Sequence, residues 1–419
     1  MLPALYFGAA HVALALAFGA VALDPRGVSG FFYHSRMLGI VHLITLGWIT
    51  ASILGSLYLV GPIALRVWLP AGWLDYLAFA LVFAGIAGMV AHFWIEDAAG
   101  LAWSAATAGT GIMAAGVHVV RRLWHAPLPR AVSAHIVLAF VNILGAAVIG
   151  VLIGFDKVYR FLPGFVLANV FAHAHLAAIG WASMMVVGVA YRVLPMVLPA
   201  EMPKGPRLWT TAILLQAGVT GLVVTLLLRR PFAWVFAVTI VVGFAAFLSQ
   251  VVWMLRHPRP RPPGVRTPDP AVWHAMAAFA SLAVAALLGL WLAIAESSSS
   301  TLRVAMAYGV FGLVGFLAQM VVGMKGRLLP ILAWYWAYAN TGYKGPVPSP
   351  HEMPWRGAQE LVFVLWLFGV PALAGGLAFD AVPFVSAAAS CLLAATLIDT
   401  VNVARILRYA FLTPSSTRL

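Results

Sequence analysis

The chain contains one helical motif in three copies. Residues 42–62, HLITLGWITASILGSLYLVGP, return without a gap as residues 175–195, HLAAIGWASMMVVGVAYRVLP. A third copy, residues 314–330, has the sequence VGFLAQMVVGMKGRLLP, and Val310 stands at its histidine position. Internal repetition on this scale indicates that one structural unit is built several times. The repeat therefore restricts the fold to copies of a helical unit, and two copies keep a side chain that can bind a metal.

The composition excludes a soluble protein. Hydrophobic residues make up 63% of the chain and charged residues only 9%, whereas roughly a quarter of the residues in a soluble domain are charged. The apolar residues fall into twelve stretches, each long enough to cross a membrane of about 30 Å as a helix. These stretches are 3–23, 38–62, 72–95, 98–120, 131–154, 168–194, 207–228, 231–255, 271–295, 303–324, 357–379 and 382–405. We therefore predict an all-α polytopic membrane protein with twelve transmembrane helices.

The repeat divides these helices into three units of four. Its period of about 134 residues predicts pseudo-symmetric repeats at 1–130, 131–270 and 271–419, which together form one integral membrane domain. Two glycines eight residues apart recur in every copy, a spacing that allows helix backbones to approach closely, so we expect them to be packing residues. A histidine in the first helix of each unit is weaker support for the same unit boundaries. These histidines are His11, His135 and His274.

Basic residues are distributed unevenly between the loops. Segments after even-numbered helices, together with the C-terminus, hold eighteen of the 25 Lys and Arg residues. By the positive-inside rule both termini are expected to be cytoplasmic, in a multi-pass protein of the inner (plasma) membrane. The net charge of +13 therefore follows membrane topology and does not indicate nucleic-acid binding. The one cysteine, Cys391, excludes a disulfide framework and a cysteine-based metal site.

Five histidines are expected in the outer half of the membrane: His34, His42, His92, His173 and His175. Ionisable side chains inside a bilayer are costly and usually mark a functional site. His173 and His175 are two residues apart, and such residues point about 200° apart around a helix. They can therefore serve two sites on opposite sides of one helix, although a lone buried histidine is often only a packing residue.

The repeat relates His42 to His175, since both occupy the first position of their motif copies. Two neutral imidazoles on opposite faces of a planar macrocycle are the ligands of a low-spin haem. We predict this role for the two residues. His173 would be a ligand of a second centre, to which His92 and His34 could contribute as copper or haem ligands. Hard metals are poor candidates, because no carboxylate cluster accompanies these histidines.

These motifs resemble subunit I of the haem–copper oxidases, and its C-type branch most closely. Residues 172–195 are similar to the tenth helix of that subunit, with its His-x-His and Gly-x-x-Tyr-x-x-x-Pro pattern. Residues 36–60 resemble its second helix, which bears a low-spin haem ligand. The resemblance implies twelve helices in three arcs, low-spin haem ligation by His42 and His175, and a high-spin haem on His173.

The chain also departs from that family. Its His-x-His helix lies in the second unit rather than the third, the histidines of the respiratory copper centre are missing, and Asp399 is an isolated acidic residue in the last helix. In size, and in lacking proton channels, the chain is similar to the NnrS family of haem- and copper-containing membrane proteins. We therefore expect a divergent homologue that stands alone.

The leading hypothesis is a haem-binding integral membrane redox protein with b-type haem, optional copper, and oxygen or nitric oxide as its small-molecule ligand. As an enzyme it would be an oxidoreductase of the haem–copper oxidase or nitric oxide reductase type, with cytochrome c or another protein as electron donor. Arg36 could pair with haem propionates near the outer surface. The alternatives are a non-catalytic haem sensor or assembly protein, and a repeat-built transporter or metal permease.

Overall fold

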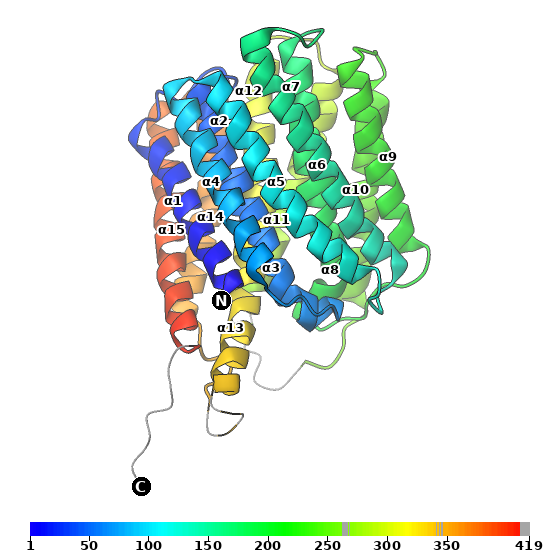
Figure 1. Cartoon of the computed structure of the whole chain (residues 1–419), viewed down its shortest axis with the longest axis vertical. Helices are drawn as coiled ribbons and strands as arrows, with labels where there is room; N and C mark the ends of the chain where they lie inside the picture. Colours follow the sequence, from blue (N-terminus) through cyan, green and yellow to red (C-terminus); the bar gives the residue numbers. More distant parts are fainter. Residues whose placement is uncertain (262–266, 268, 341, 343, 345–346, 411–419) are drawn as a thin grey trace.

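The computed structural model describes residues 1–261, 267, 269–340, 342, 344 and 347–410. Within these ranges the regular elements are all helices, and most are long rods lying side by side (Figure 1). The one extended pairing among the described residues is an isolated bridge between Ala200 and Pro258. The expected all-α class is therefore confirmed for this part of the chain. Residues 411–419 of the expected third unit lie outside it.

The helices follow one another with short connections, and several rods contain more than one element. In chain order they are α1 (Leu2–Leu23), α2 (Ser35–His42), η1 (Leu43–Thr50), α3 (Ala51–Val60), η2 (Gly61–Leu65), α4 (Trp73–Ile95), α5 (Ala98–Leu123), α6 (Arg130–Tyr159), α7 (Val166–His175), η3 (Leu176–Ser183), α8 (Met184–Val197), α9 (Arg207–Leu227), α10 (Ala233–Arg256), α11 (Pro270–Ile294), α12 (Ser299–Gly309), η4 (Val310–Ala318), α13 (Gln319–Asn340), α14 (Arg356–Ala378) and α15 (Val382–Arg408). The elements labelled η are π-helical.

Each of the twelve predicted apolar stretches coincides with one continuous rod, for example 35–65 for the second stretch. Among the described residues, 11 rods are long and apolar enough to cross a membrane, and α5 is not one of these. Large apolar side chains such as Leu16, Val141 and Phe368 are exposed on the rods, as lipid-facing surfaces require. The arrangement is that of a multi-pass helical membrane protein in contact with the lipid bilayer.

Each copy of the repeated motif contains a π-helical segment. The segment η1 begins directly after His42, η3 directly after His175, and η4 at Val310. π-helical turns are rare and usually occur as single-turn bulges, often at functional sites. These segments instead extend over 8, 8 and 9 residues. The three motif copies therefore share a backbone distortion as well as a sequence.

The three π-helical segments meet in the interior of the molecule. η1, η3 and η4 contact one another pairwise, and two indole hydrogen bonds join them. Trp48 Nε1 in η1 donates to the Ala318 carbonyl oxygen of η4 at 3.3 Å. Trp181 Nε1 in η3 donates to Thr50 Oγ1 of η1 at 3.0 Å. Because both indoles are buried, these bonds satisfy donors that an apolar interior would otherwise leave unpaired.

The second of the two glycines in each motif copy packs against the first helix of its expected unit. These glycines are Gly55, Gly188 and Gly323. A Cβ at each would overlap the Cβ of Tyr6, His135 and His274, respectively. His135 and His274 therefore occupy matching places. His11 also lies in the first helix of its unit, as expected, but Tyr6 takes the matching place in α1.

Replacement of Gly188 by alanine is expected to destabilise the fold. The added methyl group would collide with His135, and overpacking costs roughly 1–3 kcal/mol, more than the roughly 1 kcal/mol that alanine gains over glycine in a helix. The matched control is Gly375→Ala in α14, where a Cβ has no neighbour within 4 Å. Thermal unfolding in detergent should show a lower Tm for the first variant only. Equal Tm values for the two variants would contradict the packing role.

Candidate functional site

Two of the predicted site histidines face each other. His42, the last residue of α2, and His173 in α7 have ring centroids 6.3 Å apart and ring planes inclined by 23°. His42 Nδ1 donates to the Leu38 carbonyl oxygen at 2.7 Å, and His173 Nδ1 donates to the Ala146 carbonyl oxygen at 2.8 Å. A carbonyl oxygen can only accept, so the proton is on Nδ1 in both rings. Each Nε2 therefore carries the lone pair that a metal requires.

The separation of these rings suits two ligands on opposite sides of one metal. A metal–imidazole bond is about 2 Å long, and the ring nitrogen lies about 1 Å from the ring centroid by simple geometry. Two opposed imidazoles on one metal therefore have their centroids about 6 Å apart. The observed 6.3 Å agrees with this value. The ring of Phe93, 5.1 Å from that of His42, adds an apolar wall on one side.

His175 faces the other side of α7, toward α12. Its Nδ1 donates to the Phe171 carbonyl oxygen at 2.8 Å, and the Tyr308 hydroxyl donates to its Nε2 at 3.2 Å. The predicted separation of His173 and His175 onto two sides of one helix is therefore observed. The predicted facing of His42 and His175 is not, because the face of α7 turned toward His42 carries His173.

Tyr308 was not identified from the sequence, although a signal for it exists. His175 corresponds to Val310 in the third motif copy, so the residue two positions earlier, Tyr308, corresponds to His173. The third copy thus lacks the motif histidine but has a polar aromatic residue two positions before that place. A comparison of the residues preceding each motif copy would have found this tyrosine.

The other predicted site residues have partners of their own. His34 caps α2, where its Nδ1 accepts from the Met37 amide at 3.4 Å. Arg36 forms an ion pair with Asp24 at 2.7 Å, and His92 Nδ1 lies 3.1 Å from a carboxylate oxygen of Asp97. Across the described residues, no group of three or more His, Cys, Asp or Glu side chains could hold a metal ion. The structure does not assign His34, Arg36 or His92 to the pair.

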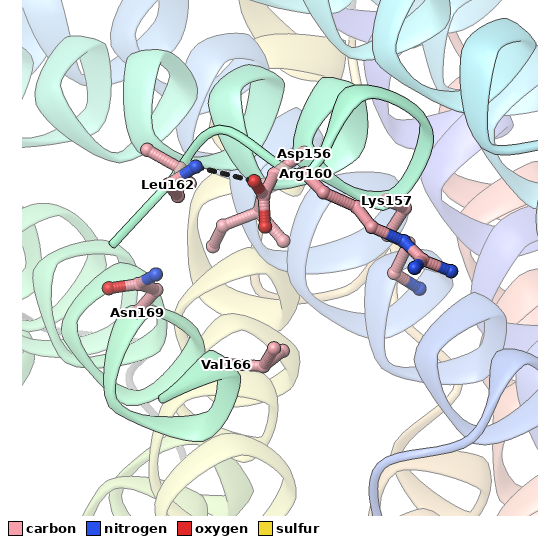
Figure 2. A pocket seen from close by; sticks show the side chains of 7 residues that line it. Asp156, Lys157, Arg160, Leu162, Val166 and Asn169 are labelled. Atoms are coloured by element: carbon pink, nitrogen blue, oxygen red, sulfur yellow. Dashed lines mark hydrogen bonds between the residues drawn. The ribbon is translucent and has the colours of Figure 1, made fainter. Parts of the chain in front are cut away.

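A pocket of about 330 Å³ with charged side chains in its lining lies one helical turn away from His173, between α6 and α7 (Figure 2). Asn169 precedes His173 by one turn on α7. On α6, Ile153 follows Gly150, a residue whose Cβ would contact the His173 ring. The pocket also contains two cationic side chains, Lys157 and Arg160. Cations beside the histidine pair suit an anionic group such as a carboxylate. The full lining is Ile153, Asp156, Lys157, Arg160, Leu162, Val166 and Asn169.

A cluster of charged residues in the membrane interior was also missed. Asp399, expected to be isolated, forms an ion pair with Lys325 in α13 and lies 3.4 Å from His11 Nε2. Lys325 belongs to the third motif copy, at a position where the other copies have Leu57 and Ala190. Side chains from α1, α13 and α15 therefore meet at one point. The sequence places the three residues far apart, and only the packing of the helices brings them together.

Comparison with known proteins adds no family assignment. No protein-family model matches the chain, and no curated protein is significantly similar to it. The motif resemblance described for residues 36–60 and 172–195 therefore stays an expectation, and the geometry of the histidines has to carry the functional argument.

Titration of His34 is expected to make stability depend on pH. Burial and the neighbouring Arg36 guanidinium lower the pKa of His34 from its ordinary value. The unfolded chain then binds the proton more readily, so the stabilising effect is complete above about pH 6.5 and is lost as the pH falls toward the folded-state pKa. Protonation would also remove the lone pair that caps α2.

Asparagine caps helices well and does not titrate, so His34→Asn is the matched variant. Thermal unfolding across the acidic range should show a smaller loss of Tm in His34→Asn than in the unchanged protein. The same loss of Tm in both proteins would exclude His34 as the titrating group.

Proposed function

We propose that this chain is a haem-binding integral membrane redox protein related to subunit I of the haem–copper oxidases, with His42 and His173 as the axial ligand pair. The observation that carries the proposal is the closeness of the two rings, whose centroids lie 6.3 Å apart, with Nδ1 of each ring bonded to a carbonyl oxygen and Nε2 of each ring left as a lone-pair donor. This pair replaces the pairing of His42 with His175 expected from the repeat. The motif resemblance supports the same class of cofactor.

The donor set favours haem over a bare metal ion. A zinc or copper ion in a protein commonly takes three or four protein ligands. The described residues offer no such group. Haem brings four equatorial nitrogens of its own and needs only axial ligands from the protein, for which two imidazoles suffice. Copper then remains an optional addition at a second centre and is not the main cofactor.

In this proposal the cofactor supplies one-electron chemistry, and the protein fixes its ligands. The Leu38 and Ala146 carbonyl oxygens hold the two imidazoles in one tautomer and orientation. Lys157 and Arg160 line the adjacent pocket and could bind carboxylates, a role first expected of Arg36. Arg36 lies beside Asp24 instead, so it would have to give up that ion pair.

His175 and Tyr308 are proposed to form a second centre on the far side of α7. The tyrosine hydroxyl can donate a hydrogen bond to His175 Nε2, as observed at 3.2 Å, or turn to a ligand held near that nitrogen. A small molecule such as oxygen or nitric oxide is the proposed ligand, and cytochrome c or another protein the proposed electron donor. If no small molecule binds at this centre, the alternative of a non-catalytic haem sensor or assembly protein is favoured.

The architecture is proposed to be twelve transmembrane helices in three pseudo-symmetric units, 1–130, 131–270 and 271–419. The matching π-helical segments and the matching glycine contacts of His135 and His274 support it. The distribution of Lys and Arg supports the inner (plasma) membrane with both termini cytoplasmic.

Optical spectra of the purified protein test the ligand pair. Reduced protein should show the sharp Soret and alpha bands of a low-spin haem. His42→Ala and His173→Ala should each remove them, because a low-spin haem needs both axial ligands. His175→Ala should keep them, and His257→Ala, at an exposed loop position, is the matched control.

Two outcomes would contradict this assignment. Loss of the bands in His175→Ala but not in His173→Ala would restore the pairing expected from the repeat. Protein that binds no haem after reconstitution would reject the haem proposal and favour the transporter alternative. Carbon monoxide should shift only the part of the spectrum that depends on His175, if a second haem is present there.

A further inference from the structure

Three ionisable side chains from three helices meet in the membrane interior. Lys325 Nζ in α13 lies 2.6 Å from His11 Nε2 in α1 and forms an ion pair with Asp399 Oδ2 in α15. His11 Nε2 lies 3.4 Å from the same carboxylate oxygen. The relative exposures of the side chains of His11, Lys325 and Asp399 are 3%, 0% and 10%. This set is named the His11–Lys325–Asp399 cluster.

The hydrogen bonds fix the resting protonation of the cluster. His11 Nδ1 lies 2.6 Å from the Phe7 carbonyl oxygen, which can only accept, so Nδ1 carries the proton. His11 Nε2 is therefore a lone-pair acceptor, and the Lys325 ammonium donates to it as well as to Asp399. One cation, one anion and one neutral imidazole leave the cluster without net charge, which suits a site of low dielectric.

The surroundings contain one more titratable group and one aromatic face. From α11, His274 lies near both Asp399 and Lys325, and its buried Nδ1 has no hydrogen-bond partner among the described residues. From η1, the Trp48 ring lies 5.0 Å from Lys325 Nζ and 5.0 Å from the His11 ring centroid. An indole face attracts cations. The site can therefore stabilise a positive charge on either His11 or Lys325.

A purely structural ion pair would not need this third member. Replacing a buried ion pair by apolar residues is often neutral or stabilising, so such a pair is weak evidence for a role in stability alone. Here the imidazole of His11, a side chain type that changes charge near neutral pH, places its unprotonated Nε2 beside the ion pair of Lys325 and Asp399. Inside membranes such combinations mark proton pathways.

We propose that the His11–Lys325–Asp399 cluster is a proton-binding site inside the membrane, with His11 Nε2 as the accepting atom. A hydronium ion from the aqueous side gives one proton to His11 Nε2: one O–H bond of hydronium breaks, one N–H bond forms, and a water molecule is released. The new N–H donates to Asp399 Oδ2. Lys325 keeps its proton and donates to the same carboxylate. The cluster gains one positive charge, the hydrogen bond from Lys325 to Nε2 is lost, and no further reactant is needed.

Further polar residues lie beyond the cluster, toward the end of the molecule where α1 begins. Asn402, one turn beyond Asp399 in α15, accepts from the Trp355 amide at 2.8 Å. Arg327, two residues beyond Lys325, lies 3.7 Å from Asp269 and 3.1 Å from His351. Figure 1 shows the start of α1 and the lower part of α13 at this end. We therefore expect the proton to arrive from this side.

The test is the protonation of His11 followed by nitrogen NMR of protein with ¹⁵N-labelled histidine, over about pH 5 to 8. The His11 signal is assigned by its absence from His11→Gln. In the unchanged protein it should convert to the imidazolium form as the pH falls. His257→Gln, at an exposed position with a stacked Trp253, is the matched control and should leave this signal unaltered.

Neighbouring charges should change the proton affinity of His11 in opposite directions. Asp399→Asn removes the anion and should lower the affinity by roughly tenfold or more. Lys325→Gln removes the cation and should raise it by a smaller factor, because Asp399 is not only a charge but also the hydrogen-bond acceptor of the protonated Nε2. The double variant Lys325→Gln/Asp399→Asn leaves no unpaired charge and should fold even if the single variants do not. In it His11 should bind the proton less readily than in the unchanged protein.

A His11 signal that stays neutral over the whole range in the unchanged protein would overturn the proposal. So would equal titration in the unchanged protein and the double variant, because the proton would then not depend on the charged partners. The measurement needs no haem, so a failure of the haem proposal would not affect it. The two proposals can therefore fail independently.

Discussion

The mutual contact of the three π-helical segments fixes the positions of the polar side chains in this protein. Inside a membrane every buried donor needs an internal acceptor, and the buried indoles of Trp48 and Trp181 find theirs on neighbouring segments. These bonds hold η1, η3 and η4 against one another. The elements joined to these segments carry His42, His173 and Lys325, so their positions follow from this contact.

Two polar sites of different character flank the contact. On one side, His42 and His173 are two imidazoles that each donate Nδ1–H to a backbone carbonyl oxygen, a set suited to a metal with its own equatorial ligands. On the other, the His11–Lys325–Asp399 cluster combines opposite charges whose sum is zero. The segment η1 joins them, since it starts after His42 and carries Trp48 six residues later.

Much of the fold could be predicted from the sequence because spanning helices are long apolar runs. The predicted stretches 72–95 and 382–405, for example, differ little from α4 and α15. The π-helical segments were not predicted, since their composition does not differ from that of an ordinary apolar helix. The depth expected from the sequence correctly placed His42 and His173 at one level of the membrane. It could not decide which histidine of α7 faces α2, because that depends on the rotation of the helix about its axis.

The sequence by itself determined that the chain is helical and membrane-spanning, and that His173 and His175 serve opposite sides of one helix. Apolar length and the 100° turn per residue are local properties, so they can be read from the chain directly. Only the tertiary structure decided that His42 faces His173, that Tyr308 contacts His175, and that Asp399 is paired with Lys325 and His11. These are contacts between residues distant in sequence. They depend on how whole helices rotate and pack, and no local pattern encodes that.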